Sequence, residues 1–179
     1  MMRKFVCGAA LAALCMAQGV AAQKQAAPKC LTRPQAEKLV VAVLPALVRG
    51  AQRKCAEQVA PTASLYTSGN RITKVFQPAA DAAWPEARKT LPILTGSNEL
   101  SSLDDVLLRP LFESIVAEEV AGKFEAEDCD TVDQVFDALL PLPPENFGKL
   151  FVVLYDVGKD EKPGEKRPFT ICADKAGKR

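Results

Sequence analysis

The sequence predicts an all-α fold, a single domain of about five kinked helices clamped by two disulfides. Apolar residues recur at helical spacing in five segments, and prolines lie inside or beside most of these segments. Four cysteines remain after an expected leader is removed, and an even number in an exported chain is typical of disulfides. An α+β fold with a C-terminal β-hairpin is the alternative.

Residues 1–22 have the pattern of a secretory signal peptide. Arg3 and Lys4 give a basic start, residues 5–17 form a short apolar stretch, and residues 20–22 form a small-residue cleavage site. We therefore expect a mature, soluble domain of residues 23–179 that is periplasmic in a bacterium or secreted. No later segment has the roughly 20 apolar residues of a transmembrane helix.

A first helix is expected over residues 33–56, because Thr32 and Gln35 form a capping box and Pro34 suits a first turn. Pro45 lies off the apolar stripe, so we expect it to kink the solvent side of this helix. The stripe consists of Leu39, Val40, Val43, Leu44, Leu47, Val48 and Ala51.

The second element follows a connector at residues 61–70, with Asn70 as its expected cap and Gly96 at its end. Pro78, Pro85 and Pro92 each cost about 3 kcal/mol inside a straight helix, so two or three short kinked segments are expected. Its apolar positions are Ile72, Val75, Phe76, Ala79, Ala83, Ala87, Leu91 and Leu94.

Ser101 and Ser102, each followed three residues later by an aspartate, predict the start of a third helix. Pro110 is expected to kink this helix, and Gly122 lies near its end. The apolar stripe that we expect to be buried is Leu103, Val106, Leu107, Leu111, Phe112, Ile115, Val116 and Val120.

Two shorter helices complete the prediction. Asp130 caps the fourth, which stops at Pro141, and Pro143 with Pro144 opens the fifth, which closes at Gly158. The fourth bears Val132, Val135, Phe136, Leu139 and Leu140, and the fifth bears Phe147, Leu150, Phe151, Leu154 and Tyr155.

Residues 150–155 also form a continuous β-favouring run. A hairpin from this run back through residues 169–172, across a charged loop at residues 159–167, is the alternative. We favour the helix, because Pro-Pro-Glu-Asn is a helix start signal and a lone hairpin could not easily bury both faces. The loop at residues 159–167 is expected to be exposed.

Cys30, Cys55, Cys129 and Cys172 are expected to form two bridges. A helix over residues 33–56 separates its ends by roughly 35 Å, whereas bridged Cα atoms lie about 5.5 Å apart. In an up-and-down bundle Cys55 then lies beside Cys129 and Cys30 beside Cys172, the pairing that we favour. The rival pairs Cys30 with Cys55 and Cys129 with Cys172, which needs a shorter first helix.

The chain contains no histidine, which removes the commonest general base and metal ligand. No catalytic, metal or nucleotide motif is present, so catalytic residues stay unknown and no cofactor is expected. Clustered acids could hold calcium, but acids near the start of a helix more often stabilise it. This cluster comprises Glu125, Glu127, Asp128, Asp130 and Asp133.

Two further sets of residues are candidate sites. Glu113, Glu118 and Glu119 could supply a glycosidase-like acid pair, although adjacent glutamates point about 100° apart on a helix and a solvated face is favoured. Trp84, Tyr66 and Tyr155 could line a ligand pocket between helices. Core roles are favoured for Trp84 and Tyr155.

A non-enzymatic binding or interaction protein is the function that these observations favour. Its expected partner is an envelope protein or a small apolar ligand, and the near-neutral formal net charge of +1 argues against nucleic acid. A carboxylate-dependent envelope hydrolase and a carrier of a small apolar ligand are the alternatives. A polar cleft with two carboxylates favours the hydrolase, an apolar cavity the carrier, and an exposed apolar patch the interaction protein.

Overall fold

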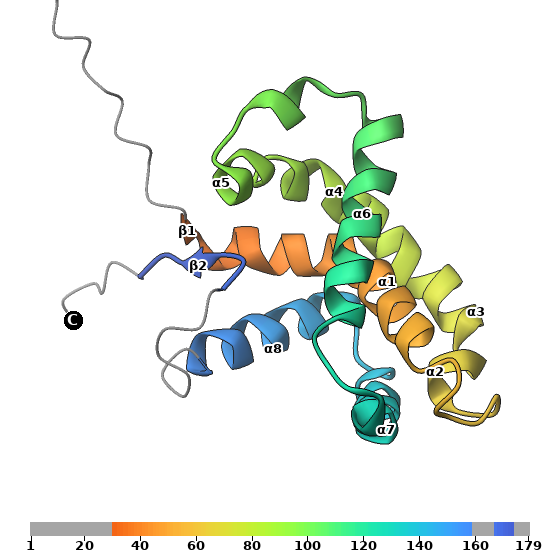
Figure 1. Cartoon of the computed structure of the whole chain (residues 1–179). Coiled ribbons are helices and arrows are strands. Elements are labelled where there is room, and N and C mark those ends of the chain that lie inside the picture. Colours follow the sequence, from red (N-terminus) through yellow and green to blue (C-terminus); the bar gives the residue numbers. More distant parts are fainter. Residues whose placement is uncertain (1–29, 159–166, 174–179) are drawn as a thin grey trace, which may run out of the picture.

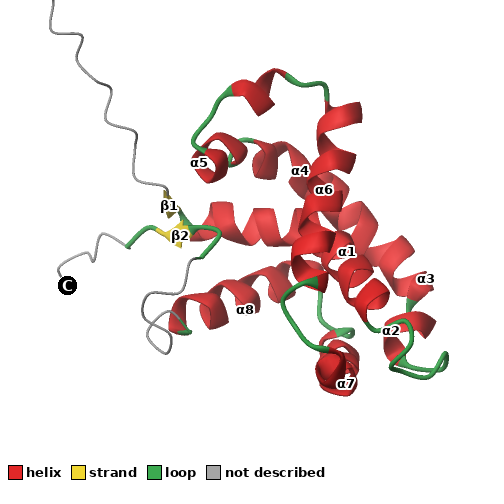
Figure 2. Cartoon of the chain, in the orientation of Figure 1, coloured by secondary structure: helices red, strands yellow, loops and turns green. Residues whose placement is uncertain are grey.

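The computed structural model describes residues 30–158 and 167–173, which form an all-α domain apart from one two-residue strand pair (Figure 2). Five helices exceed ten residues, in agreement with the five expected. The elements are β1 (Cys30–Leu31), α1 (Arg33–Lys54), α2 (Ser64–Thr67), α3 (Gly69–Arg71), the π-helical η1 (Ile72–Phe76), α4 (Gln77–Arg88), α5 (Leu91–Thr95), η2 (Glu99–Ser102), α6 (Asp105–Ala121), η3 (Ala126–Asp128), α7 (Cys129–Leu139), α8 (Pro144–Val157) and β2 (Thr170–Ile171). The signal peptide expected at residues 1–22 lies outside the described residues.

Helix α1 is the centre of the fold (Figure 1). It begins at the predicted capping box, in which Thr32 accepts from the Gln35 backbone N–H and Gln35 accepts from Thr32. Helices α4, α6 and α8 all pack against it, and every residue from 39 to 46 is buried. Pro45 is among the fully buried side chains, so its placement on a solvent side was wrong. An uninterrupted apolar run predicts a helix covered all round, and no solvent side exists at Pro45.

The second predicted element is a chain of short helices. The connector is shorter than expected, because α2 begins at Ser64 and Asn70 lies inside α3 and does not cap a helix. Pro78 and Pro92 occupy first turns, of α4 and α5, where a missing N–H is tolerated. Gly96 ends α5 with a left-handed φ of 71°, the conformation that favours glycine at this position.

The remaining helices begin and end near the predicted residues. Asp104 caps α6 by accepting from the Val106 N–H, while Ser102 belongs to the preceding η2. Residues 150–155 lie within α8, so the helix is confirmed and the C-terminal hairpin is wrong. The strand pairing that exists joins β1 and β2 in parallel, with Cys30 opposite Thr170. No helix in the described residues combines the length and hydropathy of a membrane span.

Two glycines allow neighbouring helices to approach α1 closely. A Cβ atom at Gly50 would lie 2.5 Å from the Ala117 carbonyl oxygen on α6. A Cβ atom at Gly148 on α8 would lie 2.9 Å from the Glu37 carbonyl oxygen and 2.9 Å from Val41 Cγ2. All three distances are shorter than those that real Cβ atoms make. The absence of side chains at Gly50 and Gly148 therefore sets the spacing of α6 and α8 from α1.

Both ends of α1 carry a disulfide. Cys30, just before α1, is bonded to Cys172, and Cys55, at the C-cap of α1, is bonded to Cys129 at the start of α7. These are the favoured pairs, and the rival pairing is wrong. The 22 residues of α1 separate Cys30 from Cys55 by roughly 33 Å, which no disulfide spans.

The C-terminal segment packs back onto α8. The Tyr155 ring stacks on Phe169 at 4.5 Å and lies nearly parallel to Phe151 at 6.1 Å, and its hydroxyl donates to the Phe169 carbonyl at 2.7 Å. Of the charged loop expected at residues 159–167, Arg167 alone is described. It is half-buried, not exposed, because its guanidinium lies over the Tyr155 ring and donates to the Tyr155 carbonyl.

Candidate functional site

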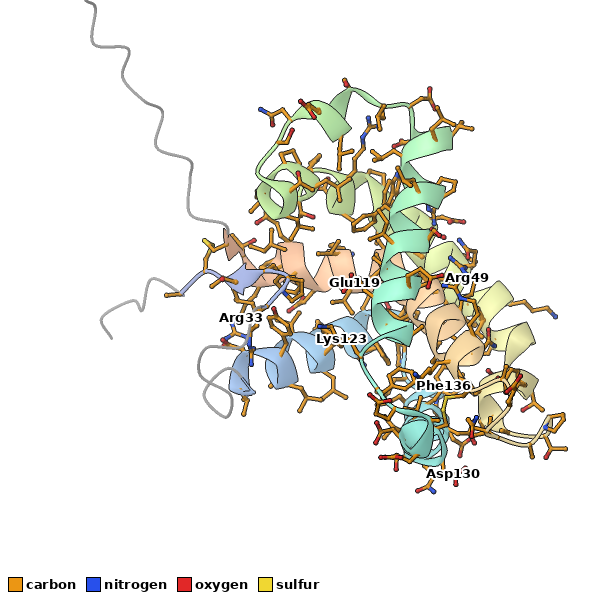
Figure 3. The ribbon with its side chains drawn as sticks, viewed as in Figure 1. Arg33, Arg49, Glu119, Lys123, Asp130 and Phe136 are labelled. Carbon is orange, nitrogen blue, oxygen red and sulfur yellow. A yellow bond between two sulfur atoms is a disulfide. The ribbon has the colours of Figure 1, made fainter. Side chains whose placement is uncertain are left out.

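Three of the five acidic residues at positions 125–133 hold helix starts in place, whereas Asp130, which we expected to cap a helix, lies within the first turn of α7. Glu125 and Asp128 form a reciprocal capping box around η3, and the Asp133 carboxylate accepts from the Leu65 N–H at 2.7 Å. Figure 3 shows Asp130 on the outer side of α7, where it is exposed, and Phe136 on the side toward α1. In the part of the chain that the structure describes, no three His, Cys, Asp or Glu side chains are grouped to hold a metal ion.

Two of the three glutamates of α6, Glu113 and Glu118, are paired with arginines. Glu113 accepts from Arg49 on α1 and, at 2.8 Å, from Arg109 one turn earlier on α6. Glu118 forms an ion pair with Arg53 at 2.8 Å, and Glu119 is exposed. The three carboxylates are therefore not brought together.

An open polar cleft of about 570 Å³ lies between α1, α2 and α6. Glu113 is the one carboxylate among the residues described on its walls, and both of its oxygens accept hydrogen bonds from arginine. A two-carboxylate hydrolysis needs a second acid facing the same space. Among the described residues, the walls of this cleft hold no such pair. Its described lining is Arg49, Gln52, Arg53, Ala56, Tyr66, Pro110, Glu113, Ser114 and Ala117.

Arg109 joins α6 to α4 at the edge of this cleft. It donates to Asp81 at 2.6 Å and lies over the Trp84 ring at 5.5 Å. The hydrogen bond from Gln77, together with that from Arg109, lowers the pKa of Asp81 below its ordinary value. Burial alone would lower the pKa of Arg109, but the hydrogen bonds to Asp81 and Glu113 raise it. Arg49, Glu113, Arg109 and Asp81 thus form a row of ion pairs that joins α1, α6 and α4. We call this row the charge ladder.

The three aromatic residues weighed as pocket walls are separated. Trp84 is buried in the core, where its ring meets Phe112 and its indole N–H donates to Asp105. Tyr155 packs against the C-terminal segment as described above. Tyr66 lines the polar cleft, donates to the Gln52 carbonyl at 2.6 Å, and has a pKa raised by burial.

The apolar face of α6 that the sequence assigns to the core is largely exposed. Val106 is 78% exposed and Leu107 is 68% exposed, while Leu111 and Ile115 are also exposed. Helix α6 instead buries Leu108 and Ala117, with Phe112 and Val116 partly buried against the core. We call the set Val106, Leu107, Leu111 and Ile115 the α6 outer face.

Helix α8 is apolar on two opposite sides. Its inner side places Gly148 and Val152 against α1, and Phe151 and Tyr155 are half-buried beside them. The other side carries Leu150, Val153, Leu154 and Val157, all exposed, at the i, i+3, i+4 and i+7 positions of one stripe. Leu150 and Leu154, which the sequence places at helical spacing with Phe151 and Tyr155, therefore lie outside the core. We call these four residues the α8 outer face.

An apolar groove of about 380 Å³ opens next to the start of α8, between α1 and α7. Its walls include Leu47 and Val48 of α1, Val132 and Val135 of α7, and Phe147 of α8. Phe147 lies three residues before Leu150 and seven before Leu154, so it shares one side of the helix with them. We call this feature the α7 groove, and its Phe147 wall lies on the same side of α8 as Leu150 and Leu154.

The structure also shows an arginine whose role the sequence analysis missed. Arg71 of α3 donates to the carbonyl oxygens of Leu140, Pro141 and Leu142, in the turn between α7 and α8. This contact fixes the position from which α8 starts. Nothing near Arg71 in the sequence indicates a partner so far along the chain. For Arg109, by contrast, its spacing of four from Glu113 was a usable signal.

Comparison with known proteins gives no assignment: no protein-family model, curated protein or solved structure matches this chain.

Proposed function

We propose that this protein is a non-enzymatic interaction protein of an extracytoplasmic compartment, periplasmic or secreted, which binds other protein through the outer faces of α6 and α8. One observation carries the proposal: eight large apolar side chains are exposed on these two helices, four on each. Exposed contiguous apolar surface on a folded domain marks interaction sites, because water covers it at a free-energy cost. The two disulfides support the compartment, since such bonds persist where conditions are oxidising.

Two features favour binding over hydrolysis. The polar cleft presents Glu113 already bound by Arg49 and Arg109, which leaves no second carboxylate on its described walls for acid and base roles. Recognition by amphipathic helix faces needs apolar residues at i, i+3, i+4 and i+7 spacing, which the α8 outer face has.

The test is site-specific photocrosslinking in the cells that make the protein. A photoreactive residue at Leu111 or Leu154 should give discrete protein adducts, whereas the same residue at the exposed positions Glu57 or Lys74 should not. Leu107→Lys should abolish the adduct formed at position 111, and Leu150→Lys should abolish the adduct formed at position 154. Neither substitution should alter the circular dichroism spectrum. Equal labelling at all four positions, or none at the apolar ones, would reject the proposal.

The α7 groove favours a second candidate function, carriage of a small apolar molecule. Its walls are almost entirely aliphatic and aromatic, and its volume suits a short acyl chain or a ring system. A fluorescent fatty acid should then bind with one-to-one stoichiometry. Val132→Trp, which fills the groove, should abolish that binding, while Leu111→Trp on α6 should leave it unchanged. Binding that survives Val132→Trp would exclude the groove as the site.

A further inference from the structure

The α8 outer face has the spacing of a short two-helix seam. Asn146, Leu150, Val153 and Val157 are separated by four, three and four residues, which is the a/d pattern of a coiled coil over almost two heptads. Leu154 lies beside the seam, and none of these residues carries a charge. The seam is exposed along its length, with Val153 at 50% and Leu154 at 61%. Helix α8 thus presents a face built for another helix.

From this seam we propose that two copies of the chain pair through antiparallel α8 helices, in a two-fold symmetric dimer. The inference rests on the proposed function and names the partner of one of its two faces. A two-fold interface needs a patch that is complementary to itself. The four seam residues are uncharged and are spaced evenly about the midpoint between residues 151 and 152, so they meet that requirement when the second helix runs in the opposite direction.

The charges beside the seam favour the antiparallel arrangement. Lys149 and Asp156 lie seven residues apart, two helical turns, and so flank the same edge of the α8 outer face. Reversal of the second helix about the central point brings Lys149 of one copy next to Asp156 of the other, twice by symmetry. Asp156 already accepts from Arg33 within its own chain, and Lys149 of the second copy would lie beside this ion pair. A parallel two-fold pair would instead place Lys149 and Asp156 of the two copies on opposite edges of the seam, where they could not pair.

The α7 groove adds contact area at each end of such a pair. The antiparallel arrangement places Val157 of one copy near Phe147 of the other, where the groove opens. Four half-exposed side chains supply on the order of 300 Å² per copy, and the groove with its flanking residues brings the buried area toward the roughly 800 Å² per partner of a stable interface.

The α6 outer face does not meet the same requirement. The exposed acids Asp104 and Glu119 lie at its N-terminal and C-terminal ends, whereas Asp105 and Glu118 are paired with Arg88 and Arg53. Two such faces would bring acids together in either orientation, which opposes self-association. The α6 outer face therefore binds a partner of different sequence, and the α8 outer face binds the second copy.

Sedimentation velocity over a range of protein concentrations tests the proposal. The wild type should show a monomer–dimer equilibrium, and Val153→Lys should weaken it by about a hundredfold or more, because a charge would be buried at the centre of the seam. Leu111→Lys on α6 is the matched control and should leave the equilibrium unchanged. Lys149→Glu should weaken the dimer by about tenfold, with an effect that diminishes at high salt.

A zero-length carbodiimide cross-link gives the orientation. In a mixture of isotope-labelled and unlabelled protein, Lys149 of one chain should couple to Asp156 of the other. A protein that is monomeric at every concentration, or a dimer that survives Val153→Lys, would overturn the pairing. A monomer whose Leu154 photocrosslinks to a different protein would keep the proposed function and reject the self-pairing alone; a monomer without adducts at Leu111 or Leu154 would reject both.

Discussion

Helices α1 and α8 are both apolar on opposite sides, but the fold covers them differently. Helices α4, α6 and α8 surround α1, so that its residues 39–46 are buried in every direction. Helix α8 meets α1 on one side and presents Leu150, Val153, Leu154 and Val157 on the other. The comparison shows that apolar composition indicates how much of a helix surface must be buried. It does not indicate whether the residues that bury this surface belong to the same chain.

The largest expected effect concerns the C-terminal anchor of α1. Replacement of Cys55 and Cys129 together by alanine should lower the free energy of unfolding by about 2–5 kcal/mol, because the bridge restricts the unfolded chain and both residues are fully buried. Denaturant unfolding under oxidising conditions measures the loss. A double variant as stable as the wild type would mean that α1 does not depend on this clamp.

The close approaches to α1 should give the next largest effect. Gly50→Ala and Gly148→Ala should each cost about 1–3 kcal/mol, because the added Cβ meets backbone or side-chain atoms at 2.5–2.9 Å. Gly69→Ala is the control, since nothing lies within 4 Å of its Cβ position. It should be neutral or stabilising by a few tenths of a kcal/mol through the unfolded state. Thermal and chemical unfolding of the three variants would measure these differences. If all three variants were as stable as the wild type, the close packing against α1 would be refuted.

The charge ladder that joins α1, α6 and α4 should contribute least to the free energy of unfolding. The pKa of Asp81 is lowered in the folded protein, so its contribution to stability is present above its ordinary pKa of 3.8 and is lost as the pH falls through the lower, folded value. Because the side chain is half-exposed, we expect less than about 1 kcal/mol. Asp81→Asn should therefore flatten the decline of stability below about pH 4 relative to wild type.

The matched control for this acid titration is Glu57→Gln, an exposed loop position. Its stability should follow the wild-type curve throughout. If Asp81→Asn also follows that curve, Asp81 does not contribute to the acid dependence through the ladder.

The sequence predicts where helices lie better than which side they bury. The capping box of Thr32 and Gln35 marked the start of α1, and the 22-residue length of α1 decided the cysteine pairing by excluding the rival. For α6 the apolar periodicity was ambiguous. Leu107, Leu111 and Ile115 form one stripe, while Leu108, Phe112 and Val116 form another with the same spacing, and tertiary contacts bury the second.

For α8 the deciding residue is one that hydrophobic patterns do not count. Gly148 lies against the α1 backbone at Glu37, and this close contact turns Val152 inward and Leu154 outward. The long-range partners of Arg71 and Glu113 were likewise beyond sequence reasoning, because they depend on how helices far apart in the chain cross. The candidate sites consequently emerged only from the packed structure.

The most direct test of this account compares two adjacent residues of α8 that differ in exposure alone. Val152 is 1% exposed against α1, and Val153 is 50% exposed on the α8 outer face. At concentrations where both variants are monomeric, Val152→Lys should cost several kcal/mol or prevent folding, since it buries a charge, whereas Val153→Lys should change the free energy of unfolding by about 0.5 kcal/mol or less. If Val153→Lys proves as destabilising as Val152→Lys, the face described as open to a partner belongs to the core, and the contrast between α1 and α8 is contradicted.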